Sequence, residues 1–303
     1  MDIKERINEL KARKNAVILA HYYTPFEVQA VADYVGDSFY LARIAKSSSA
    51  DIIVFCGVKF IVESAKILNP DKKVLMPDVT ADCPMAHMAD LKKIKEMREK
   101  YPDLAVVCYI NSTAELKCHS DVCVTSSNAV KIVKSLPNKN IFFIPDKNLG
   151  RFVAEQVPEK NVLLNDGFCP VHAAVSKNEV LDAKKKYPDA KVLSHPECEK
   201  EILDISDFIG STSDIISFAS NSEAERFIIC TEDGIEFELG TSMKDKSFLF
   251  PATRPCCKDM KLNTLEKLLY VLETEENEIT VDDEIRERAL LPLEKMLELG
   301  RSK

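Results

Sequence analysis

Three cysteines stand in similar proline-containing segments and are separated by nearly equal lengths of chain. Cys83, Cys169 and Cys257 occur in ADCPM, GFCPV and RPCCK, 86 and 88 residues apart. Thiolates are good metal ligands, and three of them leave one coordination position open. The spacing therefore predicts a metal site where three equivalent loops meet, with ordinary packing of the thiols as the alternative. Because Cys256 adjoins Cys257, the spacing alone leaves the third ligand ambiguous.

Polar residues that could handle protons recur at nearly the same interval. Three apolar runs, at 16–23, 104–111 and 190–197, end in polar side chains at two equivalent positions. The first position holds His21, Tyr109 and His195, and the second holds Tyr23, Asn111 and Glu197, at offsets of 88 and 86 residues. Glu197 is the only carboxylate of the six. We expect an acid–base group here, although a single histidine at a strand end is also typical of a structural role.

Serine or threonine precedes three helical patterns at the same offsets. Ser38, Ser126 and Thr212 occupy equivalent positions, each before a segment with helical periodicity. Such residues are typical N-caps, which need no ligand. Three helix N-termini directed at one axis would nevertheless attract anions, because unpaired N–H groups and the helix dipole favour carboxylate or phosphate. We therefore expect a substrate that carries several negative charges.

The elements that must position these residues follow from the hydrophobic pattern. Each of three repeats is predicted to contain helix, strand, helix, strand, helix and strand. Apolar runs predict strands at 51–57, 73–78, 141–146 and 226–233, and a 3.6-residue period predicts helices at 58–68, 92–101 and 178–187. This alternation predicts parallel sheets covered on both faces, with ligands bound beyond the carboxyl ends of the strands.

The repeats divide the chain into three predicted domains with boundaries at the three cysteines. These are residues 1–83 together with 258–303, residues 84–169, and residues 170–257. The tail is predicted to form helices at 263–276 and 284–300 that return to pack on the first repeat.

Composition excludes several classes of protein. The net charge is −8, and no cluster of basic residues interleaved with aromatic residues occurs, so nucleic acid is not an expected partner. No apolar run approaches the ~20 residues that cross a bilayer, and the charged N-terminus does not resemble a signal peptide. We expect a cytoplasmic protein, in which the ten cysteines serve packing, catalysis or metal binding instead of disulfides.

Across nearly its whole length the chain resembles quinolinate synthases, the iron–sulfur enzymes of NAD biosynthesis. The motifs that carry the resemblance are LAHYY (19–23), GDS (36–38), KILNPDKKVLMPD (66–78), CPMA (83–86), YINST (109–113), TSSNAV (125–130), PDKNLG (145–150), GFCPVH (167–172), HPEC (195–198), GST (210–212) and CCKDMKLNTL (256–265). The resemblance implies an α/β fold of three pseudo-threefold-related αβα sandwich domains around a 4Fe–4S cluster. Three cysteines would bind this cluster and leave one iron open to substrate. In the family's last motif the ligand lies three residues before Met, which selects Cys257 over Cys256.

The resemblance also implies an activity and a set of site residues. The family condenses iminoaspartate with dihydroxyacetone phosphate to give quinolinate, phosphate and water, and an aspartate oxidase or dehydrogenase supplies the iminoaspartate. Such an enzyme is a transferase. The residues that match the family's substrate pocket are His21, Tyr23, Ser38, Tyr109, Asn111, Ser126, His195, Glu197, Ser211 and Thr212. Of these, we expect Tyr23, Tyr109, His195 and Glu197 to be catalytic and the others to bind substrate.

Two alternatives belong to other classes of function. An aconitase-type 4Fe–4S dehydratase would have the same open iron but a different polyanionic substrate, and its product would distinguish it. A non-catalytic iron–sulfur sensor or electron carrier, or a zinc-stabilised binding protein, would need no pocket of histidine, tyrosine, carboxylate and hydroxyl groups. The sequence therefore favours the enzyme.

Overall fold

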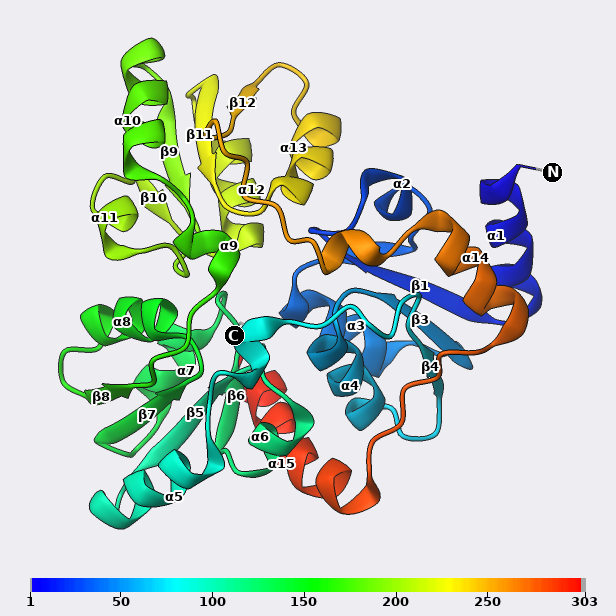
Figure 1. Ribbon diagram of the computed structural model, residues 1–303, viewed down its shortest axis with the longest axis horizontal. Helices are drawn as coiled ribbons and strands as arrows, with labels where there is room; N and C mark the ends of the chain where they lie inside the picture. The colour runs from blue at the N-terminus through cyan, green and yellow to red at the C-terminus, as the bar shows by residue number, and fades with distance from the viewer. Residues whose placement is uncertain (1, 301–303) are drawn as a thin grey trace.

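The computed structural model describes residues 2–300 and contains three parallel sheets of four strands each (Figure 1). The first sheet comprises β1 (Ala16–His21), β2 (Tyr34–Gly36), β3 (Ile52–Cys56) and β4 (Lys73–Leu75). The second comprises β5 (Ala105–Tyr109), β6 (Val122–Val124), β7 (Asn140–Ile144) and β8 (Asn161–Leu164), and the third comprises β9 (Lys191–Ser194), β10 (Phe208–Ile209), β11 (Arg226–Cys230) and β12 (Ser247–Leu249). In every sheet the second strand in chain order is at one edge, followed by the first, third and fourth. The α/β fold of three sandwich units is therefore as predicted.

Helices cover both faces of the sheets, as the alternating pattern predicts. The helices of the first unit are α1 (Ile3–Arg13), α2 (Phe26–Gln29), α3 (Ser38–Ser47), α4 (Lys59–Leu68) and α14 (Leu265–Thr274). Those of the second are α5 (Leu91–Lys100), α6 (Ala114–Cys118), α7 (Ala129–Ser135) and α8 (Lys147–Gln156), and those of the third are α9 (Pro170–Ala173), α10 (Lys177–Lys186), α11 (Lys200–Leu203), α12 (Thr212–Asn221) and α13 (Glu236–Ser242). The 3-10 turns are η1 (Pro84–His87), η2 (Asp233–Ile235) and η3 (Met260–Leu262), and α15 spans Asp283–Gly300.

In the first and third units, neighbouring strand residues alternate between two hydrophobic cores, which is why both faces need cover. In the third unit Val192 packs with α10 and α11, whereas Leu193 packs with α12 and α13. In the first unit Ile18 packs with α1 and α14, and Leu19 with α3 and α4. Strands buried on both faces must be apolar at every position, and this explains the continuous apolar runs in the sequence.

Each unit has one more strand than the hydrophobic pattern predicts. The additional strands, β2, β6 and β10, are edge strands of only two or three residues, too short to show a period. An aspartate just before each of them, Asp33, Asp121 or Asp207, holds it against the neighbouring strand. The backbone N–H of each aspartate donates to the carbonyl of one residue in the neighbouring strand, which is Ile18, Val106 or Val192. The carboxylate of the aspartate accepts the backbone N–H of that strand residue at 2.7 to 2.9 Å.

The C-terminal helices pack on two different units. Helix α14 lies against α1 and β3 of the first unit, as expected. Helix α15 instead packs on α6, α7 and β6 of the second unit while touching α4 of the first, so the expectation for this helix is wrong in part (Figure 1). Its buried residues Ala289, Leu293 and Met296 join a core that the first two units share. Helical periodicity identifies the apolar face of α15 but not the surface that it covers.

Figure 1 shows the three units arranged around a common centre. The strands of each sheet come from a single one of the three predicted domain ranges, while the exact boundaries at the cysteines stay a prediction. In residues 2–300 no helix combines the length and the apolar character that crossing a membrane requires.

Replacing Asp207 with asparagine should destabilise the fold in a pH-dependent manner. Burial favours a higher pKa for Asp207, but the N–H of Val192 and the ammonium of Lys191 outweigh burial and lower its pKa below the ordinary 3.8. A carboxylate with a lowered pKa stabilises the folded state fully above pH 3.8, and this contribution disappears as the pH falls through the folded-state pKa. The variant should lose about 1 kcal/mol at pH 7 and progressively less below pH 4. Urea unfolding of the reduced apoprotein at several pH values measures this, and a pH-independent difference would contradict it.

Candidate active site

The three cysteine loops share one backbone interaction that sets their register. In each unit a backbone N–H just after the third strand donates to the carbonyl two residues before the cysteine. The pairs are Lys59 to Ala81 (2.9 Å), Lys147 to Gly167 (2.7 Å) and Asp233 to Pro255 (2.8 Å). This register makes Cys257, and not the exposed Cys256, the counterpart of Cys83 and Cys169. All three counterparts line a single cavity among the units.

The thiols of this cavity are held in their neutral form by their surroundings. Burial raises the pKa of Cys83 and Cys169 well above the ordinary 9, and it raises the pKa of Cys257 to about 11. The negative charge of a neighbouring thiolate adds to the shift, since Cys257 acts on Cys83 and Cys83 on Cys169. A bound cation would reverse this balance by stabilising the thiolates, so the three sulfurs suit a metal or an iron–sulfur cluster.

The predicted strand-end residues meet in the same cavity. They lie at or just after the carboxyl ends of β1, β5 and β9. The predicted site residues that line the cavity are His21, Tyr23, Ser38, Cys83, Tyr109, Asn111, Ser126, Cys169, His195, Glu197, Thr212 and Cys257. Ser211 is the one predicted residue outside this lining, and its hydroxyl faces Asp214 at 2.6 Å.

Burial sets the protonation of the aromatic groups. It lowers the pKa of His21 to about 4 and that of His195 to about 3, although the charge of Glu197 opposes both shifts. It also raises the pKa of Tyr23 and Tyr109 well above 10. At neutral pH the two histidines are therefore uncharged, and both tyrosines keep their protons.

Glu197 is a buried carboxylate that retains its charge. Its side chain is about 4% exposed, and its Oε2 lies 2.7 Å from Nδ1 of His172 and 3.9 Å from Nδ1 of His195. Burial would raise the pKa of Glu197, but His172 and the hydroxyl of Tyr109 outweigh burial and lower it. Asn148 holds the backbone carbonyl of Glu197 at 3.1 Å. The carboxylate is thus fixed in place as an anion and a proton acceptor.

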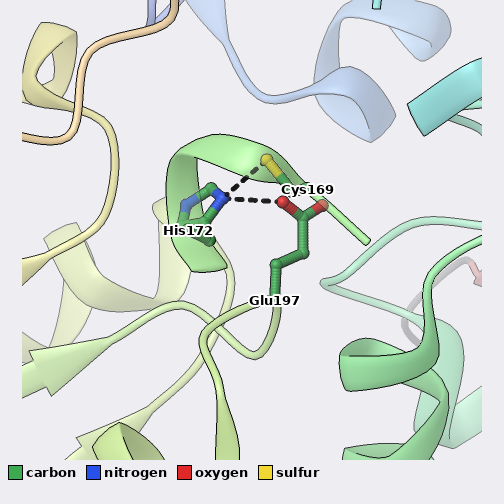
Figure 2. Close-up of side chains that lie close together, drawn as sticks. All are labelled: Cys169, His172 and Glu197. Atoms are coloured by element: carbon green, nitrogen blue, oxygen red, sulfur yellow. Dashed lines mark hydrogen bonds and ion pairs between the residues drawn. The ribbon is translucent and has the colours of Figure 1, made fainter. Parts of the chain in front are cut away.

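His172 connects Glu197 with a cysteine. Its Nδ1 lies 3.3 Å from Sγ of Cys169 as well as close to Glu197, and Figure 2 shows the three side chains converging. These three residues also form a group in which metal-ligating atoms lie within 4.8 Å of one another. Their position beside the cysteines indicates that a metal centre and an acid–base group would be neighbours.

A chain of hydroxyl groups runs on from His172 toward the first unit. Nε2 of His172 lies 2.9 Å from Oγ1 of Thr231, which lies 2.9 Å from the hydroxyl of Tyr23. That hydroxyl lies 2.7 Å from Oγ1 of Thr212 at the start of α12. The hydrogen-bonded chain therefore spans the first and third units at the cavity.

The helix N-termini reach the cavity, but their caps differ from the prediction. Asp37, not Ser38, caps α3 by accepting the N–H of Tyr40 at 2.9 Å. Asn128 occupies the cap position of α7, two residues after Ser126. Ser211, in a capping box with Asp214, is the cap of α12, and Thr212 is the first residue of that helix. A residue next to a cap has its side chain free to face the cavity, which the sequence pattern could not distinguish.

Several cavity residues were not among the predicted site residues. Asp37 lies beside Ser38 in the quoted GDS motif, whereas Glu232 has no counterpart among the predicted positions. Burial raises the pKa of Glu232 to about 7, although the ammonium of Lys261, 2.9 Å away, opposes the shift. His172 is expected near the cysteines from its place three residues after Cys169 in the quoted GFCPVH motif, and it lines the cavity. The other additional residues are Val58, Phe60, Met85, Thr125, Val171 and Met260.

One buried polar atom in the cavity has no partner. Oδ1 of Asn111 lies out of contact with water and accepts no hydrogen bond from the part of the chain that the structure describes. An unpaired buried acceptor costs about 1–3 kcal/mol, which a ligand with an N–H or O–H group would recover. The site is therefore arranged for a polar ligand at Asn111.

Comparison with known proteins gives one family and many relatives. The family described as "Quinolinate synthetase A protein" matches residues 5–298. A quinolinate synthase of Fusobacterium nucleatum is 54% identical, covering 98% of this chain and 99% of the relative. Quinolinate synthases of Clostridioides difficile and a Sulfurihydrogenibium species are each 51% identical and cover 98% or more of both chains.

Substitutions at Ser211 and Thr212 should separate a structural cap from a cavity residue. Ser211→Ala removes the cap of α12 and should lower the free energy of unfolding by about 1 kcal/mol, with no change in ligand affinity. Thr212→Val removes the hydroxyl beside Tyr23 and should weaken binding of a dicarboxylate such as malonate up to about tenfold. Urea unfolding and titration calorimetry measure the two effects. Equal losses of affinity in both variants would place Ser211 in the binding site.

Proposed function

The chain belongs to the quinolinate synthetase A family, and from this membership we propose that it condenses iminoaspartate with dihydroxyacetone phosphate to quinolinate, phosphate and water. The observation that carries the proposal is the single cavity in which three cysteines meet polar residues from three equivalent strand ends. We assign the reaction to the transferases. An aspartate oxidase or dehydrogenase would supply the iminoaspartate, and the reducing cytoplasm would suit a protein whose ten cysteines are free thiols.

We propose a 4Fe–4S cluster as the cofactor, with Cys83, Cys169 and Cys257 as its protein ligands. Support comes from the chemistry of the donor set, because three sulfurs at one cavity suit iron–sulfur binding better than a hard cation. When bound, the cluster would offer one open iron as a Lewis acid toward a substrate oxygen or nitrogen. The remaining steps can be assigned to the chain's own residues.

The anionic groups of both substrates have suitable partners at the helix starts. Ser38, Ser126 and Thr212 line the cavity at or near the N-termini of α3, α7 and α12, where N–H groups and hydroxyls favour carboxylate and phosphate. Ser211 would support this arrangement by capping α12. Oδ1 of Asn111 would accept a hydrogen bond from a substrate N–H or O–H, and neutral His21 would add a donor or acceptor.

Glu197 is the proposed base. It is an anion inside the cavity, and the reaction requires removal of protons from carbon before water can leave. Tyr109, which hydrogen-bonds Glu197, would return a proton, and neutral His195 beside it would hold the substrate. Tyr23 keeps its proton and could give it to a departing oxygen, with Thr231 holding its hydroxyl in position.

Glu197→Gln should abolish turnover while leaving the cofactor in place. The amide keeps the shape of the side chain but is a far weaker base, so quinolinate formation should fall by about 10²- to 10⁴-fold. The assay is anaerobic quinolinate production from freshly generated iminoaspartate and dihydroxyacetone phosphate. An active variant would remove the role of Glu197, and a wild-type protein that makes a different product would favour an aconitase-type dehydratase.

Anaerobically purified protein should contain close to four iron and four sulfide per chain, as the proposed cluster requires. Cys83→Ala and Cys169→Ala should each lose most of both. Cys256→Ala is the matched control, because Cys256 is exposed and outside the cavity, and it should keep the full content. Zinc without sulfide in the wild-type protein would contradict the cofactor assignment.

A further inference from the structure

Two buried carboxylates occupy equivalent positions in the second and third units. Asp146 lies two residues after β7 and Glu232 two residues after β11, and both residues are fully buried. Asp146 caps α8 and Glu232 caps η2. A buried carboxylate destabilises the fold unless its oxygens are fully hydrogen-bonded. Its hydrogen-bond partners therefore indicate its structural role.

Each carboxylate joins a helix start to the backbone of a cysteine. Asp146 accepts the N–H of Leu149 at 2.7 Å on one oxygen and the N–H of Cys169 at 3.1 Å on the other. Glu232 accepts the N–H of Gly234 at 2.7 Å and the N–H of Cys257 at 3.0 Å in the same divided manner. Both oxygens are thus engaged, one to the scaffold and one to the cysteine.

The first unit has no buried carboxylate at the equivalent position. Val58 stands at the equivalent position and has no side-chain cap bond. The N–H of Cys83 donates instead to Asp82 at 2.7 Å, and Asp82 is a partly exposed residue that faces His87. Two of the three cysteine loops are therefore anchored from inside the protein, and the third from its surface.

We propose that Asp146 and Glu232 are positioning residues that fix the backbones of Cys169 and Cys257 and so keep their sulfurs aimed at the cavity. The inference rests on the proposed role of these cysteines as cluster ligands. A backbone N–H held by a buried carboxyl oxygen limits movement of the cysteine, because the loop cannot shift without leaving that N–H unpaired inside the protein. Retention of the cluster would therefore depend on two carboxylates that do not touch it.

Amide substitutions test this role with little change of shape. In Asp146→Asn and Glu232→Gln one oxygen is replaced by an NH₂ donor, so one of the two N–H groups would face another donor instead of an acceptor. Asp121→Asn and Asp207→Asn are matched controls in the same two units. These aspartates also accept a strand N–H, from Val106 and Val192, but they hydrogen-bond none of the three cavity cysteines.

The measurement is the rate at which a chelator removes iron from the reconstituted protein, together with the electron paramagnetic resonance spectrum of the reduced cluster. Asp146→Asn and Glu232→Gln should lose iron about tenfold faster than the wild type, with a shifted or broadened spectrum. The controls should match the wild type in both readouts. Glu232→Asp, which keeps two acceptor oxygens, should recover part of the loss, and the Glu232 variants decide the question if Asp146→Asn does not fold.

Wild-type rates and spectra in both amide variants would overturn the positioning role and leave the proposed function intact. Equal acceleration in the control variants would also overturn it, because general destabilisation would then explain the loss. A wild-type protein without iron and sulfide would overturn both the cofactor assignment and this inference, so the two failures are distinguishable.

Discussion

The cavity depends on one backbone hydrogen bond that is repeated in all three units. The N–H of Lys59, Lys147 or Asp233 holds the carbonyl two residues before each cysteine, at 2.7 to 2.9 Å. This bond ties the cysteine loop to the turn after the third strand. The position of each sulfur is therefore fixed relative to its own sheet. Three sheets with the same strand order then bring the sulfurs to the same cavity.

The second constraint on the cavity is electrostatic. Glu197 keeps a negative charge inside a space whose thiols, tyrosines and two histidines are all held neutral by burial. Such a charge is tolerated only because His172 and Tyr109 bond to it and Asn148 holds its backbone. His172 also contacts Cys169, so the carboxylate lies next to the proposed cluster site. The base and the proposed metal site are thus two parts of one charge arrangement.

Much of this arrangement can be read from the sequence, because a repeat of 86 to 88 residues carries chemical groups into equivalent places. His21, Tyr109 and His195 lie at the ends of strands that are buried on both faces and therefore appear as continuous apolar runs. The edge strands β2, β6 and β10 could not be found, since two or three residues show no period and an aspartate holds them in place. The partner surface of α15 depends on tertiary contacts, which local patterns do not encode. Asp37 and Asn128, in contrast, are typical N-cap residues close to the predicted serines, and the cap bond of Asp37 is local.

The departures from threefold symmetry are as informative as the symmetry itself. One set of equivalent positions holds Val58, Asp146 and Glu232, and another holds Tyr23, Asn111 and Glu197. The three units therefore share one backbone arrangement but place different side chains at equivalent positions. A strictly symmetric cavity would place three like charges together, which would repel one another and could not divide proton transfer from substrate binding. With Glu197 as the only charged member of its set, the base lies on one side of the cavity. Uncharged Asn111 and Tyr23 leave the other sides to anionic ligands.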